Sequence, residues 1–274
     1  MIRLIKIEWG KTWNYNVFRI MGIIYVVSFL ISIIALPYIQ LKTQMTGEAD
    51  ILDFRSFYTF PIVWDSYAFI ASKSNLFLAI IVIFLVGNEY SFRTYRQHII
   101  DGLNRDELLL GKLLVIGFIA LANTLMIFLF GWIFGLIYSS GYTFADTISN
   151  LYMLGVYFLQ AVAYMIFAMF LTIWLRNKTL SMVVLLVYSL IVEPVIRLVI
   201  NKYVLAKAGL YFPVKVISKL TPIPDNGLVE FIRANAEMNG IGGSLALPLN
   251  IALAVIYAVI FYMISRQILL KRDL

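Results

Sequence analysis

The hydrophobic pattern of this chain is a series of long apolar runs separated by shorter polar segments. A helix that crosses about 30 Å of hydrocarbon needs roughly 20 mostly apolar residues. Six runs reach this length, and each predicts a transmembrane helix. They cover about residues 20–39, 62–86, 113–138, 151–175, 180–200 and 246–264. The pattern predicts an all-α integral membrane protein, with one transmembrane domain over residues 1–274.

Two segments outside these runs have an amphipathic or interrupted pattern. Residues 1–17 place Ile2, Ile5, Trp9 and Trp13 at helical spacing, which predicts a helix lying on the membrane surface. Residues 201–245 contain several prolines and two short apolar stretches, at about 214–220 and 228–232. These stretches are too short to cross a bilayer, so they predict short external helices between the fifth and sixth spans.

The distribution of basic residues predicts the orientation, because cytoplasmic loops of membrane proteins are enriched in lysine and arginine. Basic residues are more numerous in the group of segments that holds both termini, the loop after the second span and the turn after the fourth. That group contains Arg3, Lys6, Lys11, Arg19, Arg93, Arg96, Arg105, Lys112, Arg176, Lys178, Arg266, Lys271 and Arg272. The opposite group contains Lys42, Arg55, Lys202, Lys207, Lys215, Lys219 and Arg233. We therefore expect both termini in the cytoplasm, in a bacterial plasma membrane.

The cytoplasmic loop at residues 88–112 is longer than a simple connection requires. Residues 91–100 can form a short helix, which Gly102 interrupts. Asn104 then precedes Glu107 by three residues, the spacing of a capping box at the start of a helix. The loop therefore predicts a compact helical knob that leads into the third span.

Composition narrows the chemistry that the chain can carry. Hydrophobic residues make up 62% and charged residues 14%, so lipid must cover much of the surface. Cysteine is absent and His98 is the single histidine, which argues against zinc, haem and thiol chemistry. The net charge of +7 follows from the cytoplasmic basic residues, so it does not indicate nucleic-acid binding. No G-x-x-x-x-G-K-[ST] phosphate loop occurs, so we do not expect this chain to be an ATPase.

Four charged residues fall within the predicted spans, where ionisable groups are costly and usually paired or functional. Asp65 is expected at the outer interface, and we assign it no role. Lys73 and Glu193 lie at similar depths in the second and fifth spans, and Arg197 follows Glu193 by one helical turn. We expect a charge cluster of Lys73, Glu193 and Arg197 within one subunit or across a dimer. The alternative is that Arg197 extends toward the outer interface and Lys73 ends a shortened span, without a role in transport.

The six spans, the interfacial helix, the helical knob and the short external helices together resemble the permease subunit of ABC-2-type transporters. The local resemblance rests on a glutamate that ends the second span, an arginine-threonine element, a polar turn with an arginine, and a glycine-lysine pair. These are Glu89, Arg93, Thr94, Gly102, Arg105, Gly111 and Lys112. Arg93 stands where many members of that family have glycine.

The resemblance implies a homodimer of permeases, with each copy holding a separate ABC ATPase subunit that binds ATP and Mg²⁺. Residues 91–105 would be the coupling helix that sits in the ATPase. The positions implied in this coupling are Glu89, Arg93, Thr94, Arg96, Asp101, Gly102, Asn104 and Arg105. The permease itself would hold no cofactor. It would move, and by family expectation export, a small hydrophobic or amphiphilic substrate.

Three other functions stay open from the sequence. A secondary transporter driven by an ion gradient usually has broken helices, midplane polar sites and repeated halves, and only Pro194 beside Glu193 points that way. A membrane scaffold driven by an ATPase would have the same sequence features as a permease. A membrane-embedded enzyme such as a lipid hydrolase needs converging catalytic groups, which one histidine and no cysteine make a poor match.

Overall fold

The regular structure of the described part of this chain is helical. The computed structural model describes residue 10 and residues 16–45, 57–92, 104–203, 207–222, 224 and 245–271, with side chains described from residue 16 to 34 in the first helix. Of the sequence predictions, the interfacial helix at 1–17, the knob at 93–103 and the external stretch at 228–232 lie largely or wholly outside these residues.

Five helical segments are long and apolar enough to cross a membrane. They are α2 (Asn16–Met45), α6 (Arg105–Tyr138), α7 (Phe144–Ser149) together with α8 (Tyr152–Leu175), the helix that starts with α9 (Lys178–Val187), and α13 (Leu247–Lys271). These helices fit a multi-pass membrane protein and agree in position with five of the six predicted spans.

The predicted second span is a pair of helices and not one straight helix. α3 (Ile62–Lys73) and α4 (Asn75–Ser91) pass the same apolar criterion together, but they meet at an angle of 45° at Ser74. Ser72, Lys73, Ser74 and Asn75 place four consecutive polar residues at this bend. A sixth span exists if this bent pair crosses the membrane as a unit.

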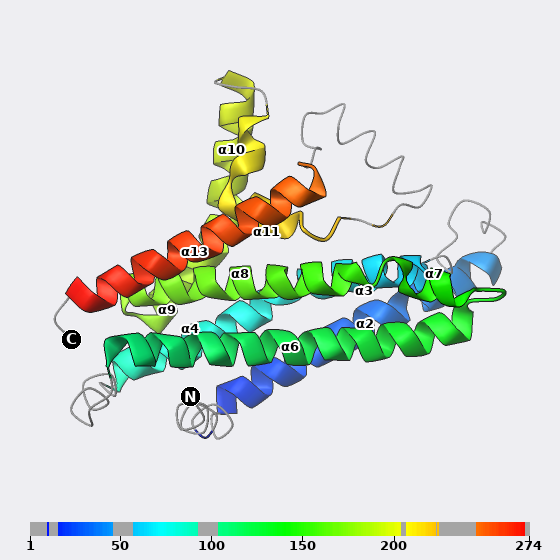
Figure 1. Ribbon diagram of the computed structural model, residues 1–274, viewed down its shortest axis with the longest axis horizontal. Coiled ribbons are helices and arrows are strands. Elements are labelled where there is room, and N and C mark those ends of the chain that lie inside the picture. The colour runs from blue at the N-terminus through cyan, green and yellow to red at the C-terminus, as the bar shows by residue number, and fades with distance from the viewer. Residues whose placement is uncertain are drawn as a thin grey trace.

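α8 forms the centre of the bundle. It packs against α4, α6, α9 and α13, and most of its side chains are buried. Figure 1 shows α13, α8 and α6 running roughly along the long axis of the molecule, with α4 and α2 behind them. Because α8 touches helices from both ends of the chain, it connects the α3–α4 pair with α13.

The fifth helical segment leaves the direction of the bundle. After α9, the chain forms a π-helical stretch, η3 (Tyr188–Val192), and continues as α10 (Glu193–Tyr203). α10 packs mainly on η3 and on the short helix η4 (Ala208–Tyr211), and it projects away from the other helices (Figure 1). The predicted span at 180–200 is therefore helical, but only its first part packs among the other spans.

One of the short helices predicted between the fifth and sixth spans is present. α11 (Pro213–Ser218) covers most of the predicted stretch at 214–220 and begins with proline, a residue favoured at the first helical position. α11 packs against α8, α13 and η4. It therefore lies beside the helical core and connects the α10 region with the last span.

Candidate functional site

The first candidate site is a group of charged residues at the end of the bundle where α4 ends, α6 begins and α13 ends (Figure 1). We call it the loop-end cluster, and it consists of Glu89, Arg105, Asp106, Lys112 and Arg266. Its buried part is an ion pair in which the Lys112 ammonium lies 2.5 Å from the Glu89 carboxylate, with both side chains almost fully buried. This contact ties the last turn of α4 to the second turn of α6.

The exposed part of the loop-end cluster joins α6 to α13. Both carboxylate oxygens of Asp106 accept hydrogen bonds from the Arg266 guanidinium, at 2.7 and 2.9 Å. Arg105 donates to the main-chain carbonyls of Leu269 and Leu270 at the end of α13. These carbonyls belong to the last turn of a helix, which carries partial negative charge, so an arginine is favourable there.

The start of α6 has the capping geometry predicted from the sequence. Asn104 is the N-cap residue, and its backbone N–H donates to the Glu107 carboxylate at 2.9 Å. On the other side of the loop, the Lys178 ammonium donates to the Asn88 side chain at 3.1 Å. A Cβ placed on Gly87 would lie 2.6 Å from the Cβ of Lys178, so α4 and α9 approach closely at this point.

These contacts hold together the ends of several helices around residues 93–103. Residues 93–103 connect α4 to α6, and the residues on both sides of this connection are held to each other, to α9 and to α13. A force applied to the connection would therefore move several helices together. Of the predicted coupling residues, Glu89, Asn104 and Arg105 lie in or beside this cluster, while Arg93, Thr94, Arg96, Asp101 and Gly102 lie outside the described residues.

Glu193 is held by the backbone of α11. It is only 1% exposed, and its two carboxylate oxygens accept the backbone N–H groups of Val214 at 3.0 Å and of Lys215 at 2.6 Å. These N–H groups belong to the first turn of α11, where they have no partner within the helix. The carboxylate thus caps α11 from a distant helix and fixes α10 beside it.

Lys73 lies close to the aromatic ring of Phe69, with its ammonium 4.3 Å from the ring centroid. Within the residues that the structure describes, no ion pair joins the Glu193 carboxylate to Lys73 or to Arg197, and the carboxylate accepts backbone N–H groups of α11. The positive charge of Arg197 still acts on Glu193. The structure thus brings Arg197 near Glu193 and gives the Glu193 carboxylate a different direct partner, the α11 backbone.

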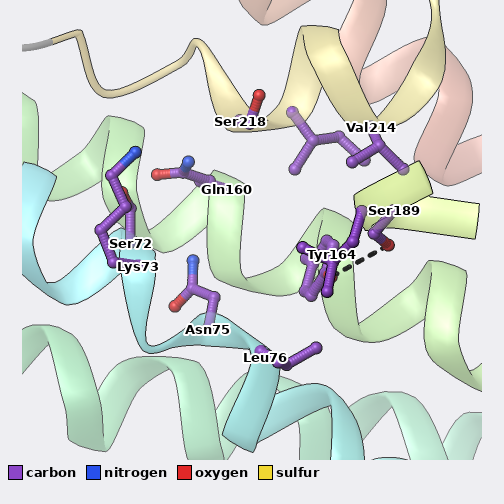
Figure 2. A pocket seen from close by; sticks show the side chains of 11 residues that line it. Ser72, Lys73, Asn75, Leu76, Gln160, Tyr164, Ser189, Val214 and Ser218 are labelled. Atoms are coloured by element: carbon purple, nitrogen blue, oxygen red, sulfur yellow. Dashed lines mark hydrogen bonds between the residues drawn. The ribbon is translucent and has the colours of Figure 1, made fainter. Parts of the chain in front are cut away.

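The second candidate site is a cavity of about 220 Å³ at the junction of α3 and α4, which we call the break cavity. Figure 2 shows it between the α3–α4 junction, α8, η3 and α11. Seven of its eleven lining residues are polar: Ser72, Lys73, Asn75, Gln160, Tyr164, Ser189 and Ser218. Leu76, Leu190, Val214 and Ile217 complete the wall. Residues of the predicted second and fifth spans therefore line the same cavity.

Contacts behind the break cavity orient two buried amide side chains. Tyr157 donates to the Asn75 side-chain oxygen at 3.1 Å and is itself hydrogen-bonded to Tyr25 at 2.8 Å. Thr221 donates to the Gln160 side-chain oxygen at 2.8 Å. Asn75 and Gln160 are 4% and 2% exposed, so these oxygens are occupied away from water. Their NH₂ groups then remain as hydrogen-bond donors at the cavity.

The pKa of Lys215, the residue after Val214 of the cavity wall, is lower than that of an ordinary lysine. Partial burial, together with the nearby positive charges of Lys219 and Arg197, lowers the pKa of Lys215 to about 8, and the negative charge of Glu193 opposes this shift. Since the folded form favours neutral Lys215, this residue makes stability rise with pH between about 8 and its ordinary pKa.

Labelling with an amine-reactive ester should therefore follow a titration with a midpoint near pH 8 at Lys215. Mass spectrometry of the labelled protein measures this profile. Glu193→Gln should move the Lys215 midpoint to lower pH, because the carboxylate that favours the ammonium form is removed. A midpoint above pH 10 for Lys215 would contradict this assignment.

The functional residues that sequence reasoning missed are those whose partners are distant in the chain. Asp106 and Arg266 are separated by 160 positions, and Gln160 and Thr221 by 61. One usable signal existed, since Pro213 marks the start of a helix whose N–H groups need an acceptor. In the described part of the chain, no group of three or more histidine and acidic residues is placed to hold a metal ion.

The comparison with known families adds one finding. The sequence profile of a family described as proteins of unknown function, DUF2705, matches residues 23–274. No curated protein matches the chain. The match extends over nearly the whole chain, from the first turns of α2 to the C-terminus, and so includes both the loop-end cluster and the break cavity. The chain therefore belongs to the DUF2705 family.

Proposed function

We propose that this chain is the membrane-spanning permease subunit of an ABC transporter, which couples to a separate ATPase subunit. The observation that carries the proposal is the loop-end cluster, in which the buried Glu89–Lys112 pair holds together the two helices that flank residues 93–103. A coupling element acts only if its movement is transmitted to the membrane-spanning helices. α6 is hydrogen-bonded to α13 at the same end, so movement of α6 would also move α13.

The proposal includes the assembly implied by the ABC-2 resemblance. Two copies of the chain form the path, and each copy holds one ATPase subunit at residues 91–105 on the cytoplasmic side of a bacterial plasma membrane. Both termini lie on that side. Closure of the ATPase dimer on ATP pushes the connection between α4 and α6, and the fixed helix ends convert this push into rearrangement of the bundle. The chain itself does not hydrolyse ATP.

Co-purification tests the ATPase partner directly. The tagged chain, expressed in its native host and extracted in mild detergent, should bring down an ABC ATPase subunit at about equal stoichiometry. Arg96→Glu in the connection should abolish this recovery, because a coupling surface depends on complementary charge. Lys202→Gln, an exposed position on α10, is the matched control and should retain the ATPase.

Each result bears on the proposal. Recovery of the ATPase with the wild-type chain and the control, and its loss with Arg96→Glu, supports coupling through the connection. A chain that is purified alone, folded and without a nucleotide-binding partner, argues against the ABC assignment. Equal recovery with Arg96→Glu would place the ATPase contact elsewhere and would contradict the proposed role of residues 91–105.

A second candidate function is favoured by one specific observation, the broken helix α3–α4 beside the break cavity. Secondary transporters often bind substrate near the midplane at discontinuous helices. The two functions differ in their energy source. Uptake or release by vesicles that contain only this chain, driven by a proton or sodium gradient and insensitive to ATP, would favour the second function.

A further inference from the structure

We propose that the break cavity is a binding site for an amphiphile with an acidic head group, a carboxylate or a phosphate. The head group lies at Lys73, Asn75 and Gln160, and the acyl chain leaves the cavity past Leu76 and Leu190. The inference deepens the proposed function by naming the class of substrate that the permease would move. Binding of the amphiphile does not depend on the proposed function, but its transport does.

The polar side of the cavity offers hydrogen-bond donors. The oxygens of Asn75 and Gln160 already accept bonds from Tyr157 and Thr221, and no bond from either NH₂ group occurs among the described residues. Both residues are almost fully buried as a whole, but neither NH₂ nitrogen is among the buried, unpartnered side-chain atoms of the described residues. The two donors are therefore open to the cavity, where a ligand or water can accept their hydrogen bonds. Figure 2 shows Asn75 rising from the start of α4, with Gln160 and Lys73 beside it.

The charges around the cavity favour an anion. Lys73 lines it, and Lys219 lies close enough to act electrostatically on Lys73 and also on Lys215. Among the residues that the structure describes, the acidic group that acts on Lys215 is Glu193, whose carboxylate accepts two N–H groups from the first turn of α11. An acidic head group would therefore relieve the repulsion between neighbouring lysines and would accept charge-assisted hydrogen bonds from Lys73 and the two amides.

The other side of the cavity suits a hydrocarbon chain. Leu76, Leu190, Val214 and Ile217 line it, and Figure 2 shows Val214 across the cavity from Ser72 and Lys73. Leu190 is 67% exposed on the surface of an apolar helix, so this wall continues to the outside of the bundle. A volume of about 220 Å³ is below the usual range for a whole drug-sized ligand. The cavity therefore accommodates the head group and leaves the chain in the lipid.

Binding by the purified full-length chain in a non-ionic detergent tests this inference without the ATPase. Dodecyl phosphate is the main probe, dodecanoate the second acid, dodecyltrimethylammonium the cationic control, and inorganic phosphate the head group alone. The measured quantity is the rise in Tm with probe concentration, which gives an apparent Kd. We expect both acids to raise the Tm of the wild type, and dodecyltrimethylammonium to leave it unchanged.

Two variants at exposed positions keep the test independent of folding. Lys73→Gln removes the cation and should weaken dodecyl phosphate binding about tenfold, the effect of losing one charge-assisted contact. Leu190→Glu places a negative charge at the wall where the chain leaves and should weaken binding at least as much. Lys202→Gln, on α10 and outside the cavity lining, is the matched control and should bind as the wild type does.

Unchanged binding of dodecyl phosphate by Lys73→Gln and Leu190→Glu would overturn the proposed site. Equal binding of dodecyltrimethylammonium would overturn the preference for an acid. If inorganic phosphate binds as tightly as dodecyl phosphate, the site takes a free anion and the amphiphile assignment is wrong. Recovery of the ATPase does not depend on the amphiphile site, and binding of the probes by Arg96→Glu does not depend on the ATPase. The two proposals can therefore be refuted independently of each other.

Discussion

Lys112→Met should destabilise the folded chain by about 3–5 kcal/mol, the usual cost of removing one partner from a buried ion pair. The Lys112 side chain is 4% exposed and lies 2.5 Å from the Glu89 carboxylate, whose side chain is 6% exposed. Methionine has a similar length and no charge, so the variant removes the ammonium with little change in packing. Reversible unfolding in mixed detergent micelles, followed by tryptophan fluorescence, measures the effect.

The double variant Glu89→Gln/Lys112→Met is the matched control for Lys112→Met. It removes both charges, and replacement of a whole buried pair is often close to neutral. We therefore expect it to recover most of the stability that Lys112→Met loses. Asp106→Asn, which breaks the exposed pair with Arg266, should have a smaller effect than Lys112→Met, since water screens that pair. A double variant as unstable as the single one would show that charge pairing is not the cause.

Glu193→Gln should weaken the attachment of α11 to α10 by about 1.5–3 kcal/mol, the range for hydrogen bonds to charged groups, while α11 stays docked in most molecules. Each Glu193 oxygen accepts one backbone N–H, from Val214 or from Lys215. Glutamine has the same shape but only one side-chain oxygen, so one of these N–H groups would face an NH₂ group. The variant should also remove the favourable placement of a negative charge at a helix start.

Hydrogen–deuterium exchange of residues 213–218 measures the release of α11. We expect exchange of these amides to rise by about 10- to 100-fold in Glu193→Gln, the equivalent of the stated free energy. Asp146→Asn is a control, because Asp146 belongs to the capping box at the start of α7, far along the chain. It should increase exchange only near residues 143–149. Unchanged exchange at 213–218 in Glu193→Gln would mean that the carboxylate does not hold α11.

Both candidate sites include residues of α4, so this helix connects them. Asn75 at the break cavity and Glu89 in the loop-end cluster are both on α4, fourteen positions apart. At 1.5 Å per residue the separation is about 20 Å. In the proposed permease, α4 is the direct path by which movement of the connection at 93–103 would reach the cavity. The bend at Ser74 is the point where such movement would alter the cavity wall.

Much of the helical layout could be predicted from local patterns. The apolar runs identified α2, α6, α8 and α13, and the spacing of Asn104 and Glu107 identified the cap of α6. The bend between α3 and α4 was not predicted, because the average hydrophobicity of residues 62–86 is high enough for one span despite the four polar residues Ser72 to Asn75. The direction of α10 could not be predicted, because it depends on the contacts that η3, η4 and α11 make.

The sequence by itself determined the positions of the apolar helices and the caps at their ends, since both depend on residues within a few positions of each other. The tertiary structure alone decided the partners of the charges. Lys73, Glu193 and Arg197 were expected to pair, yet the Glu193 carboxylate accepts backbone N–H groups of α11, and Lys73 lies over Phe69 beside a cavity. A buried carboxylate needs hydrogen-bond donors close by, and only the tertiary structure places the first turn of α11 beside Glu193.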